Sequence, residues 1–455
     1  MTQPGGALSD QSVLAHGIGG AKDLPIPLSF MLVGAAVALV VSFVVLAFAW
    51  RTPRLDGAHA GRELPVWVGD AVDSAWVHWP LRLFGLAVTA YTGWAALAGV
   101  DAAANPTLGV FYIYLWVGLV PLSLALGNVW PLLSPVRTLH EVTSRLLGSP
   151  ADRGMLGYPA WLGHWPAALG LFAFVWTELV SPDAELVTTV VRWFLVYAGV
   201  MLVGAAVFGD TFLARADPFE VWFGLVARLS PWGRRPDAQG RHRVVLRNPL
   251  QSLDTVQPTP GLLALVAVLL GSTAYDSFST SIYWLRVTAT PGSLDPTLRE
   301  SMVLLGFIAF VLLTFTGACY IGAGLPWRER RLLPRLLAHS LVPIGVGYVF
   351  AHYLTLLLES GQAYLVFLSD PLVTGEADYL GTGSWTVVYF LSTRAELLAV
   401  LKVGFVLLGH VVAVVAAHDR AVRVLPEGHR MSGQVGMLGL MLVYTVGGLL
   451  LLFSA

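Results

Sequence analysis

Long apolar runs alternate with short polar segments along most of the chain. The runs occupy residues 28–50, 80–100, 108–129, 162–180, 187–208, 260–282, 301–323, 335–358, 397–417 and 434–453. A helix of roughly 20 apolar residues is long enough to cross the hydrocarbon core of a bilayer. The pattern therefore predicts an all-α integral membrane protein, a bundle of about ten transmembrane helices.

Composition supports this fold class and narrows the choice of partners. Of the 455 residues, 56% are hydrophobic and 12% are charged, and the mean hydropathy is +0.69. Such values are typical of a polytopic membrane protein, and no nucleic-acid-binding signature accompanies them. The lone Cys319 excludes an intramolecular disulfide and any cysteine-rich metal or cluster site. Composition thus implies the lipid bilayer as a partner and no nucleic acid.

Basic and acidic residues are concentrated in alternate connections. Arginines gather within residues 137–145, 215–247, 328–335 and 420–430, whereas aspartates and glutamates gather in the connections between them. Loops rich in arginine and lysine remain in the cytoplasm. We therefore expect a multi-pass protein of the plasma membrane with both termini outside.

The same reasoning predicts the domain organisation. Residues 1–27 form an extracytoplasmic N-terminal segment, and residues 28–455 form a single transmembrane domain. Within that domain we expect a basic cytoplasmic loop at about 209–259 and a long outer loop at about 360–395. The outer loop is in a position to cover a cavity.

Two of the predicted cytoplasmic connections begin a helix in the same way. Ser134-Pro135 and Asp217-Pro218 each combine a capping side chain with a proline at the first helical position. Apolar residues repeat at helical spacing after both pairs. We therefore expect two amphipathic helices lying on the cytoplasmic interface. A short internal repeat is the other interpretation of their likeness.

Polar side chains follow one line of the predicted helix that begins near residue 335. Tyr348, His352, Thr355 and Glu359 are spaced i, i+4, i+7 and i+11, which places them on one helical face. An ionisable side chain near the bilayer centre costs about 2.5–3.5 kcal/mol. Such a stripe therefore faces the interior of the bundle or a water-filled cavity.

A second polar stripe has the same spacing and includes Asp276, on the predicted helix at 260–282. Lys402 lies at a similar depth on another helix, and Glu178 and His16 approach that depth from the outer side. Ionisable groups from several helices thus converge at one level of the predicted membrane.

This convergence has two interpretations. In the structural one, Asp276 and Lys402 form a buried ion pair, and His352 is held by a backbone carbonyl or a serine. In the functional one, His352 and Asp276, with a third ligand such as His16 or Glu359, bind a divalent metal ion that keeps an open coordination position.

Other features carry less functional information. His410 and His418 are separated by about 12 Å of helical rise and therefore cannot share one metal ion; we interpret His410 as a core residue, with a proton-relay step as the alternative. A Walker loop, G-x-S-x-G and H-E-x-x-H are all absent from the sequence. An ATP-driven pump is therefore disfavoured.

Several short motifs together carry a family resemblance. They are Ala15-His16-Gly17-Ile18-Gly19-Gly20, Asn128-Val129-Trp130-Pro131, Gly271-Ser272-Thr273-Ala274-Tyr275-Asp276, Ala351-His352-Tyr353 and Ala417-His418-Asp419-Arg420. In these motifs the chain resembles polytopic actinobacterial membrane proteins catalogued as fenitrothion hydrolases. The resemblance spans the whole chain. It implies an integral membrane enzyme that hydrolyses a phosphorothioate triester and releases a nitrophenol.

Under this hydrolase hypothesis, a metal-bound water attacks a lipophilic small-molecule substrate that enters an outer-facing cavity from the membrane. His352, Asp276 and His16 are then the metal ligands, Glu359 acts as a base or supports one, and Lys402 stabilises developing charge.

Two other classes of function remain open. One is a proton- or ion-coupled transporter, or a membrane accessory factor of respiratory or metal homeostasis machinery, in which Asp276, Lys402, His352 and His410 form a pathway. The other is a scaffold without catalytic activity, whose polar stripes only hold helices together.

Overall fold

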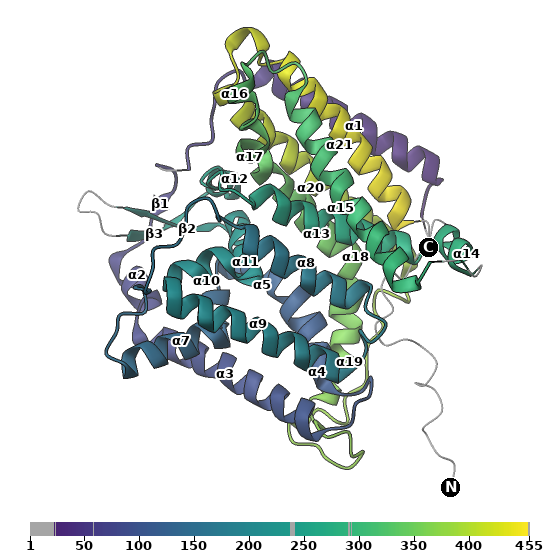
Figure 1. The fold of residues 1–455 in the computed structure, drawn as a ribbon. Helices are drawn as coiled ribbons and strands as arrows, with labels where there is room; N and C mark the ends of the chain where they lie inside the picture. The colour runs from purple at the N-terminus through teal and green to yellow at the C-terminus, as the bar shows by residue number, and fades with distance from the viewer. Residues whose placement is uncertain are drawn as a thin grey trace.

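The computed structural model of the protein describes residues 22, 24–57, 59–236, 242–289, 292 and 294–453. Long helices form a bundle, with short helices and loops at both ends (Figure 1). Within these residues, nine apolar helices are long enough to cross a membrane, and the apolar helix Trp165–Leu179 is shorter. The chain is a multi-pass membrane protein, and the predicted helical fold class is confirmed.

The long elements correspond to the apolar runs of the sequence. They are α1 (Leu28–Ala49), α3 (Ala75–Ala98), α4, η2 and α5 in succession (Pro106–Leu108, Gly109–Gly118, Leu119–Leu126), α8 (Trp165–Leu179), α9 (Val187–Phe208), α13 (Leu262–Ser279), α15 (Pro296–Tyr320), α18, η5 and α19 in succession (Val342–Thr355, Leu356–Ser360, Gly361–Phe367), α20 (Ala395–Val424) and α21 (Ser432–Leu452).

Shorter elements connect them. They are α2 (Val66–Val72), α6 (Trp130–Leu133), α7 (Pro135–Leu146), α10 (Asp210–Ala216), α11 (Pro218–Val226), η3 (Ala227–Leu229), α12 (Pro249–Leu253), α14 (Ile282–Ala289), α16 (Trp327–Arg330), α17 (Leu333–Leu337), η4 (Ala338–Leu341) and η6 (Glu427–His429), with strands β1 (Arg62–Glu63), β2 (Trp232–Pro236) and β3 (His242–Leu246).

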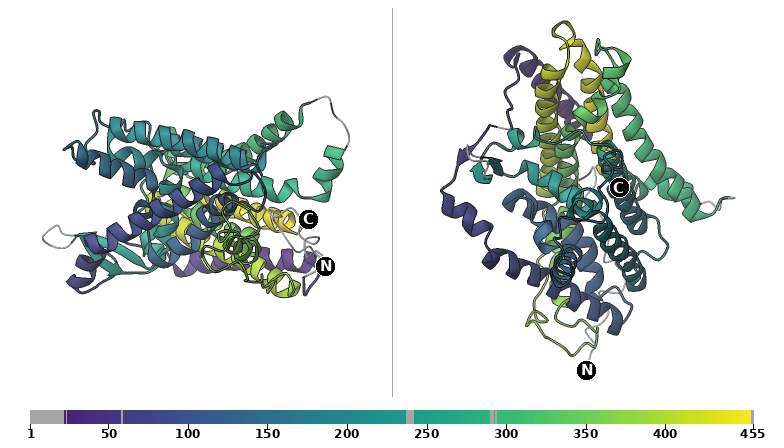
Figure 2. Two further views of the ribbon diagram at one scale, coloured as in Figure 1. Left: turned by 90° about the horizontal axis from the view of Figure 1, so that it is seen from below. Right: turned by 60° about the vertical axis from the view of Figure 1, so that its left-hand side comes forward.

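The connections gather at two opposite ends of the bundle. One end carries the strands with α2, α12 and α16, and the other carries α14, α19 and the loop at 368–394 (Figure 1). In the right-hand view of Figure 2, this loop lies at the lower end of the molecule. We call the first end the basic side because its ion pairs use Arg234, Arg420 and Arg423. The alternation of connections agrees with the predicted one.

A small sheet on the basic side was not expected from the sequence. β3 pairs antiparallel with both neighbours, in the order β1-β3-β2, with Arg62 and Trp232 both opposite Leu246. Val245 in the middle strand is fully buried. The sheet therefore fastens the chain after α1 to the segment predicted as a basic loop, which also contains α10, α11 and α12.

The predicted helix starts at Pro135 and Pro218 are both correct. The Ser134 side chain accepts a hydrogen bond from the Arg137 backbone N–H, at 3.3 Å, and Asp217 accepts one from the Phe219 N–H, at 2.9 Å. These bonds satisfy N–H groups that have no partner within a helix.

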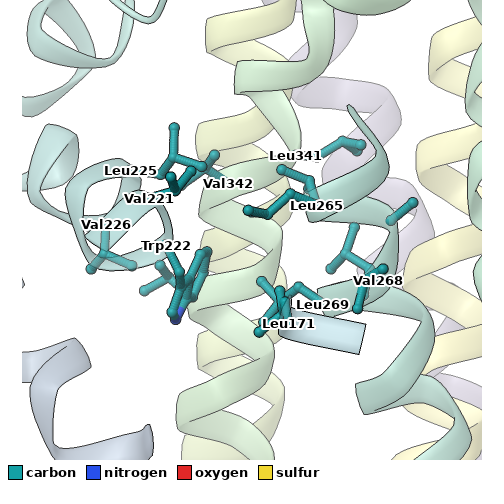
Figure 3. Close-up of a cluster of buried hydrophobic side chains, with 14 of the residues drawn as sticks. Leu171, Val221, Trp222, Leu225, Val226, Leu265, Val268, Leu269, Leu341 and Val342 are labelled. Atoms are coloured by element: carbon teal, nitrogen blue, oxygen red, sulfur yellow. The ribbon is translucent and has the colours of Figure 1, made fainter. Parts of the chain in front are cut away.

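The interfacial location predicted for α11 is wrong. Every residue of α11 except Gly224 is buried, because apart from Glu220 the helix is apolar and so has no polar face to turn toward water. Trp222 lies among Leu171 of α8, Leu269 of α13 and Val342 of α18 (Figure 3). By contrast, α7 leaves Leu139 and Leu146 exposed.

Glycines let α18 pack closely on two neighbours. A Cβ atom added to Gly347 would lie 2.5 Å from the Phe405 carbonyl oxygen of α20, and one added to Gly345 would lie 2.7 Å from Leu269 of α13. Two residues differ by roughly 200° around a helix, so these contacts lie on opposite faces. α18 therefore separates α13 from α20 at this level.

Candidate functional site: an intramembrane Asp-His-Tyr cluster

One carboxylate oxygen joins α13 to α18 inside the bundle. The Oδ2 atom of Asp276 accepts a hydrogen bond from the Tyr353 hydroxyl, at 2.8 Å, and lies 2.9 Å from Nε2 of His352. All three residues are at most 3% exposed. His352 lies seven residues beyond Gly345, and so shares the face of α18 that packs on α13.

The second imidazole nitrogen is also engaged. Nδ1 of His352 lies 3.2 Å from the Ser277 hydroxyl. A neutral imidazole satisfies both contacts by donating from Nε2 to Asp276 and accepting from Ser277, and an imidazolium satisfies them by donating from both nitrogens. The geometry therefore accommodates His352 with or without the extra proton.

A second carboxylate faces this cluster from α8. Glu178 lies close enough to Asp276, Tyr353 and Tyr112 for its charge to act on all three. Its Oε1 atom is buried and has no hydrogen-bond partner. Two carboxylates thus share a site from which water is largely excluded, and keeping both ionised there is costly.

The cluster lies near one end of the spanning helices. Asp276 precedes the last residue of α13 by three positions, and Glu178 precedes the last residue of α8 by one. These ends belong to the side opposite the basic side, because α14 follows α13 there. The site is therefore about one helical turn from that surface.

The metal site stays a prediction. Within the described ranges, no group of three or more His, Cys, Asp or Glu side chains is arranged to hold a metal ion. His352 and Asp276 supply two of the three predicted ligands, and their donor atoms engage each other and Tyr353. The third predicted ligand, His16, lies outside the described residues.

The contacts of Glu359 serve the long loop at 368–394. Oε1 of Glu359 accepts hydrogen bonds from the backbone N–H groups of Leu391 and Ser392, at 2.8 and 2.9 Å, and Oε2 accepts one from the Ser392 hydroxyl. The side chain therefore anchors the loop to η5. Its predicted catalytic role stays a prediction, and these contacts give it a structural one.

The predicted ion pair between Asp276 and Lys402 does not form. Among the described residues, the salt bridge of Asp276 is with His352, and Lys402 is buried on α20. Lys402 lies seven residues before Gly409, whose hypothetical Cβ atom would lie 2.6 Å from the Pro343 carbonyl oxygen of α18. Lys402 therefore faces the side of α18 that turns away from Asp276.

His410 behaves as the core residue that the sequence favoured. Its Nδ1 atom lies 2.8 Å from the Val406 carbonyl oxygen, one turn earlier on α20. Its ring packs edge-on against Tyr348, with 6.1 Å between centroids. It is therefore held by its own helix and by α18.

Sequence reasoning missed Tyr353 and Ser277 as parts of the site. Each follows a predicted site residue directly, and neighbours in a helix point about 100° apart. Tyr353 and His352 nevertheless reach the same oxygen, because Asp276 lies between their two directions. The signal in the sequence that could have identified Tyr353 and Ser277 is that each is a polar residue directly beside a predicted polar stripe.

Comparison of the chain with known protein families, with curated proteins and with solved structures finds no match. The geometry of the cluster is therefore the basis for assigning a function.

Proposed function

We propose that the protein is a proton-coupled membrane transporter in which Asp276, Glu178, His352 and Tyr353 form the proton-binding site. The observation that carries the proposal is a carboxylate pair: Asp276 is buried and bonded to an imidazole, and the partly buried Glu178 faces it with one buried, unbonded oxygen. One shared proton removes the repulsion between the two carboxylates, and its loss restores that repulsion. Protonation is thereby coupled to the packing of α8, α13 and α18.

The neighbouring groups suit proton exchange. The Tyr353 hydroxyl donates to Asp276, and His352 bridges Asp276 and Ser277. His352 can therefore take up a proton at one nitrogen and release it at the other. On the positive-inside rule, the basic side faces the cytoplasm of a plasma-membrane protein, and protons reach the site from outside.

Charge-displacement measurements test this proposal. The full chain is reconstituted in liposomes on a solid-supported membrane, and a drop in external pH is applied without any other solute. We expect wild type to give a transient inward charge movement that Asp276→Asn and Glu178→Gln each remove. Glu376→Gln, in the exposed part of the loop, is the matched control. Equal signals from all four proteins would refute the proposal.

The hydrolase implied by the family resemblance is the second candidate. The observation in its favour is that His352 and Asp276, two of its three predicted metal ligands, lie 2.9 Å apart. A bound divalent metal would supply a hydroxide at neutral pH and polarise the phosphoryl group of a lipophilic triester. Metal content and phosphorothioate hydrolysis, each lost in His352→Ala and with a chelator, would favour the hydrolase.

A further inference from the structure

A second buried cluster of charged groups lies on the basic side, where α10 meets α11. Arg137 of α7 donates to both oxygens of Glu220, from Nε at 3.0 Å and from Nη2 at 2.7 Å. Its Nη1 atom lies 3.3 Å from Oδ2 of Asp210. Trp130 of α6 donates to Oδ2 of Asp217, at 2.9 Å. Asp217 also lies close enough for its charge to act on Arg137, so three carboxylates surround one guanidinium.

The cluster holds more negative than positive charge. Asp217 and Glu220 are 1% and 7% exposed. The other ionisable group at its edge is His140 of α7, whose Nε2 atom is 3.7 Å from Oδ1 of Asp210. Asp210 itself is partly exposed and retains contact with water. With Arg137 charged, Asp217 and Glu220 together carry one negative charge that is not balanced inside the site.

A tyrosine hydroxyl lies beside this unbalanced charge. Tyr197 of α9 is 7% exposed, and its hydroxyl oxygen is buried with no hydrogen bond of regular geometry. The hydroxyl lies next to the Asp217 carboxylate and near Glu220. While Asp217 is ionised, the hydroxyl can donate to that carboxylate. When the carboxyl holds a proton, the same hydroxyl oxygen can accept the hydrogen bond from it.

The electrostatics agree with a bound proton. Burial raises the pKa of Glu220 to about 7; Arg137 opposes this shift, and the negative charge of Asp217 adds to it. Burial also raises the pKa of Asp217, against the hydrogen bonds from Trp130 and from the Phe219 N–H.

We propose that the α10–α11 junction is a second proton-binding site, in which Glu220 and Asp217 share one proton and Tyr197 accepts the hydrogen bond of the protonated carboxyl. The proton comes from water on the basic side and returns there, through the exposed edge at Asp210. The inference rests on the α10–α11 geometry and does not require that the cluster at Asp276 binds a proton.

Infrared difference spectroscopy of the purified full chain in lipid nanodiscs tests the proposal. Spectra taken between acidic and alkaline pH report the C=O stretch of protonated carboxyl groups. We expect a band that titrates near neutral pH in wild type and in Asp276→Asn, and that is lost in Glu220→Gln. Tyr197→Phe should keep the band but shift its frequency, because the protonated carboxyl loses its acceptor.

The infrared experiment can fail independently of the charge-displacement experiment that tests the proposed transporter. A neutral-range band that survives both Glu220→Gln and Asp217→Asn overturns the second site, even if the charge movement assigned to Asp276 is observed. If Glu220→Gln does not fold, as judged by size-exclusion chromatography, Tyr197→Phe decides. An unchanged frequency in that variant also overturns the proposal.

Discussion

Gly170 of α8 lies against the ring of Pro218 at the start of α11, where an added Cβ atom would be 3.1 Å from the proline Cγ. Glu178 follows on the same helix after eight residues, or about 12 Å of helical rise. Phe174 lies midway between them, fully buried. α8 therefore links the cluster at Asp276 to the cluster at the α10–α11 junction, and it carries an aromatic residue between them.

Phe174 belongs to a layer of rings that separates the clusters. Its ring centroid is 4.9 Å from that of Trp116 in η2 and 5.4 Å from that of Phe219 in α11. Phe219 directly follows the Asp217-Pro218 pair, and Trp116 lies beside Tyr353. A proton moving between the clusters therefore has to pass this apolar layer.

Thinning the layer should allow protons to leak. In Phe174→Leu, a smaller side chain leaves space for water between Glu178 and Asp217. We expect an imposed pH gradient, followed with an enclosed pH-sensitive dye, to collapse several-fold faster in proteoliposomes that contain this variant than in those that contain wild type. Phe48→Leu, on the exposed face of α1, is the control and should match wild type. Equal rates for both variants would contradict a separating role for Phe174.

The stability of the protein should depend on pH through Glu220. The pKa of this carboxyl rises from 4.5 to about 7 on folding, so the folded state holds a proton that the unfolded chain releases. The stability that Glu220 contributes is therefore fully present below pH 4.5 and is lost as pH rises through about 7, by up to about 1.4 kcal/mol per pH unit.

Thermal unfolding in detergent measures this dependence. From about pH 5 to 7 we expect the Tm of wild type to fall more steeply than that of Glu220→Gln, which cannot titrate. Glu427→Gln, at an exposed position on η6, should keep the wild-type slope. Parallel slopes in all three proteins would argue against a protonated Glu220.

Glu359→Gln should loosen the loop at 368–394. An amide cannot accept all three hydrogen bonds now made by the carboxylate. Each buried donor left without a partner costs about 1–3 kcal/mol. We expect faster hydrogen exchange at Leu391 and Ser392 and faster proteolysis of the loop, with Glu376→Gln as control. Wild-type exchange rates in Glu359→Gln would show that the anchor is dispensable.

The α18–α20 contact should be sensitive to one methyl group. Gly347→Ala places a Cβ atom 2.5 Å from the Phe405 carbonyl oxygen, so the helices must move apart. We expect a destabilisation of about 1–3 kcal/mol, seen as a lower Tm. Gly404→Ala adds the same methyl group on α20 where no heavy atom lies within 4 Å, and should leave the Tm unchanged or raise it. A similar Tm for the two variants would count against the close contact.

The predicted orientation rests on the distribution of charge and can be checked with single cysteines. In a Cys319→Ser background, a membrane-impermeant maleimide added to intact cells should label Glu376→Cys and leave Glu427→Cys unlabelled, because arginine-rich connections remain in the cytoplasm. Lysed cells should label both. Labelling of Glu427→Cys from outside would invert the predicted topology.

The sequence by itself determined the long helices and the polar faces that α13 and α18 turn inward. The length of an apolar run and the spacing of its polar residues are local properties of the sequence. The thickness of the bilayer requires a run of this length to cross it as a helix, in which the backbone polar groups bond to each other. His352 and Asp276 were identified in this way, since a helix can hide such groups from lipid only by turning them toward the bundle. The helix caps at Ser134 and Asp217 could also be predicted, because each depends only on residues that are close in the sequence.

Tertiary packing alone decided which inward faces meet. Asp276 contacts α18 and not Lys402, because Gly345 and Gly347 place α18 between α13 and α20. Glu359 is held by a loop residue more than thirty positions away, and α11 enters the core through contacts with several other helices (Figure 3). Helical periodicity fixes a direction around one axis, but not the neighbour in that direction, which depends on how all the helices pack at once.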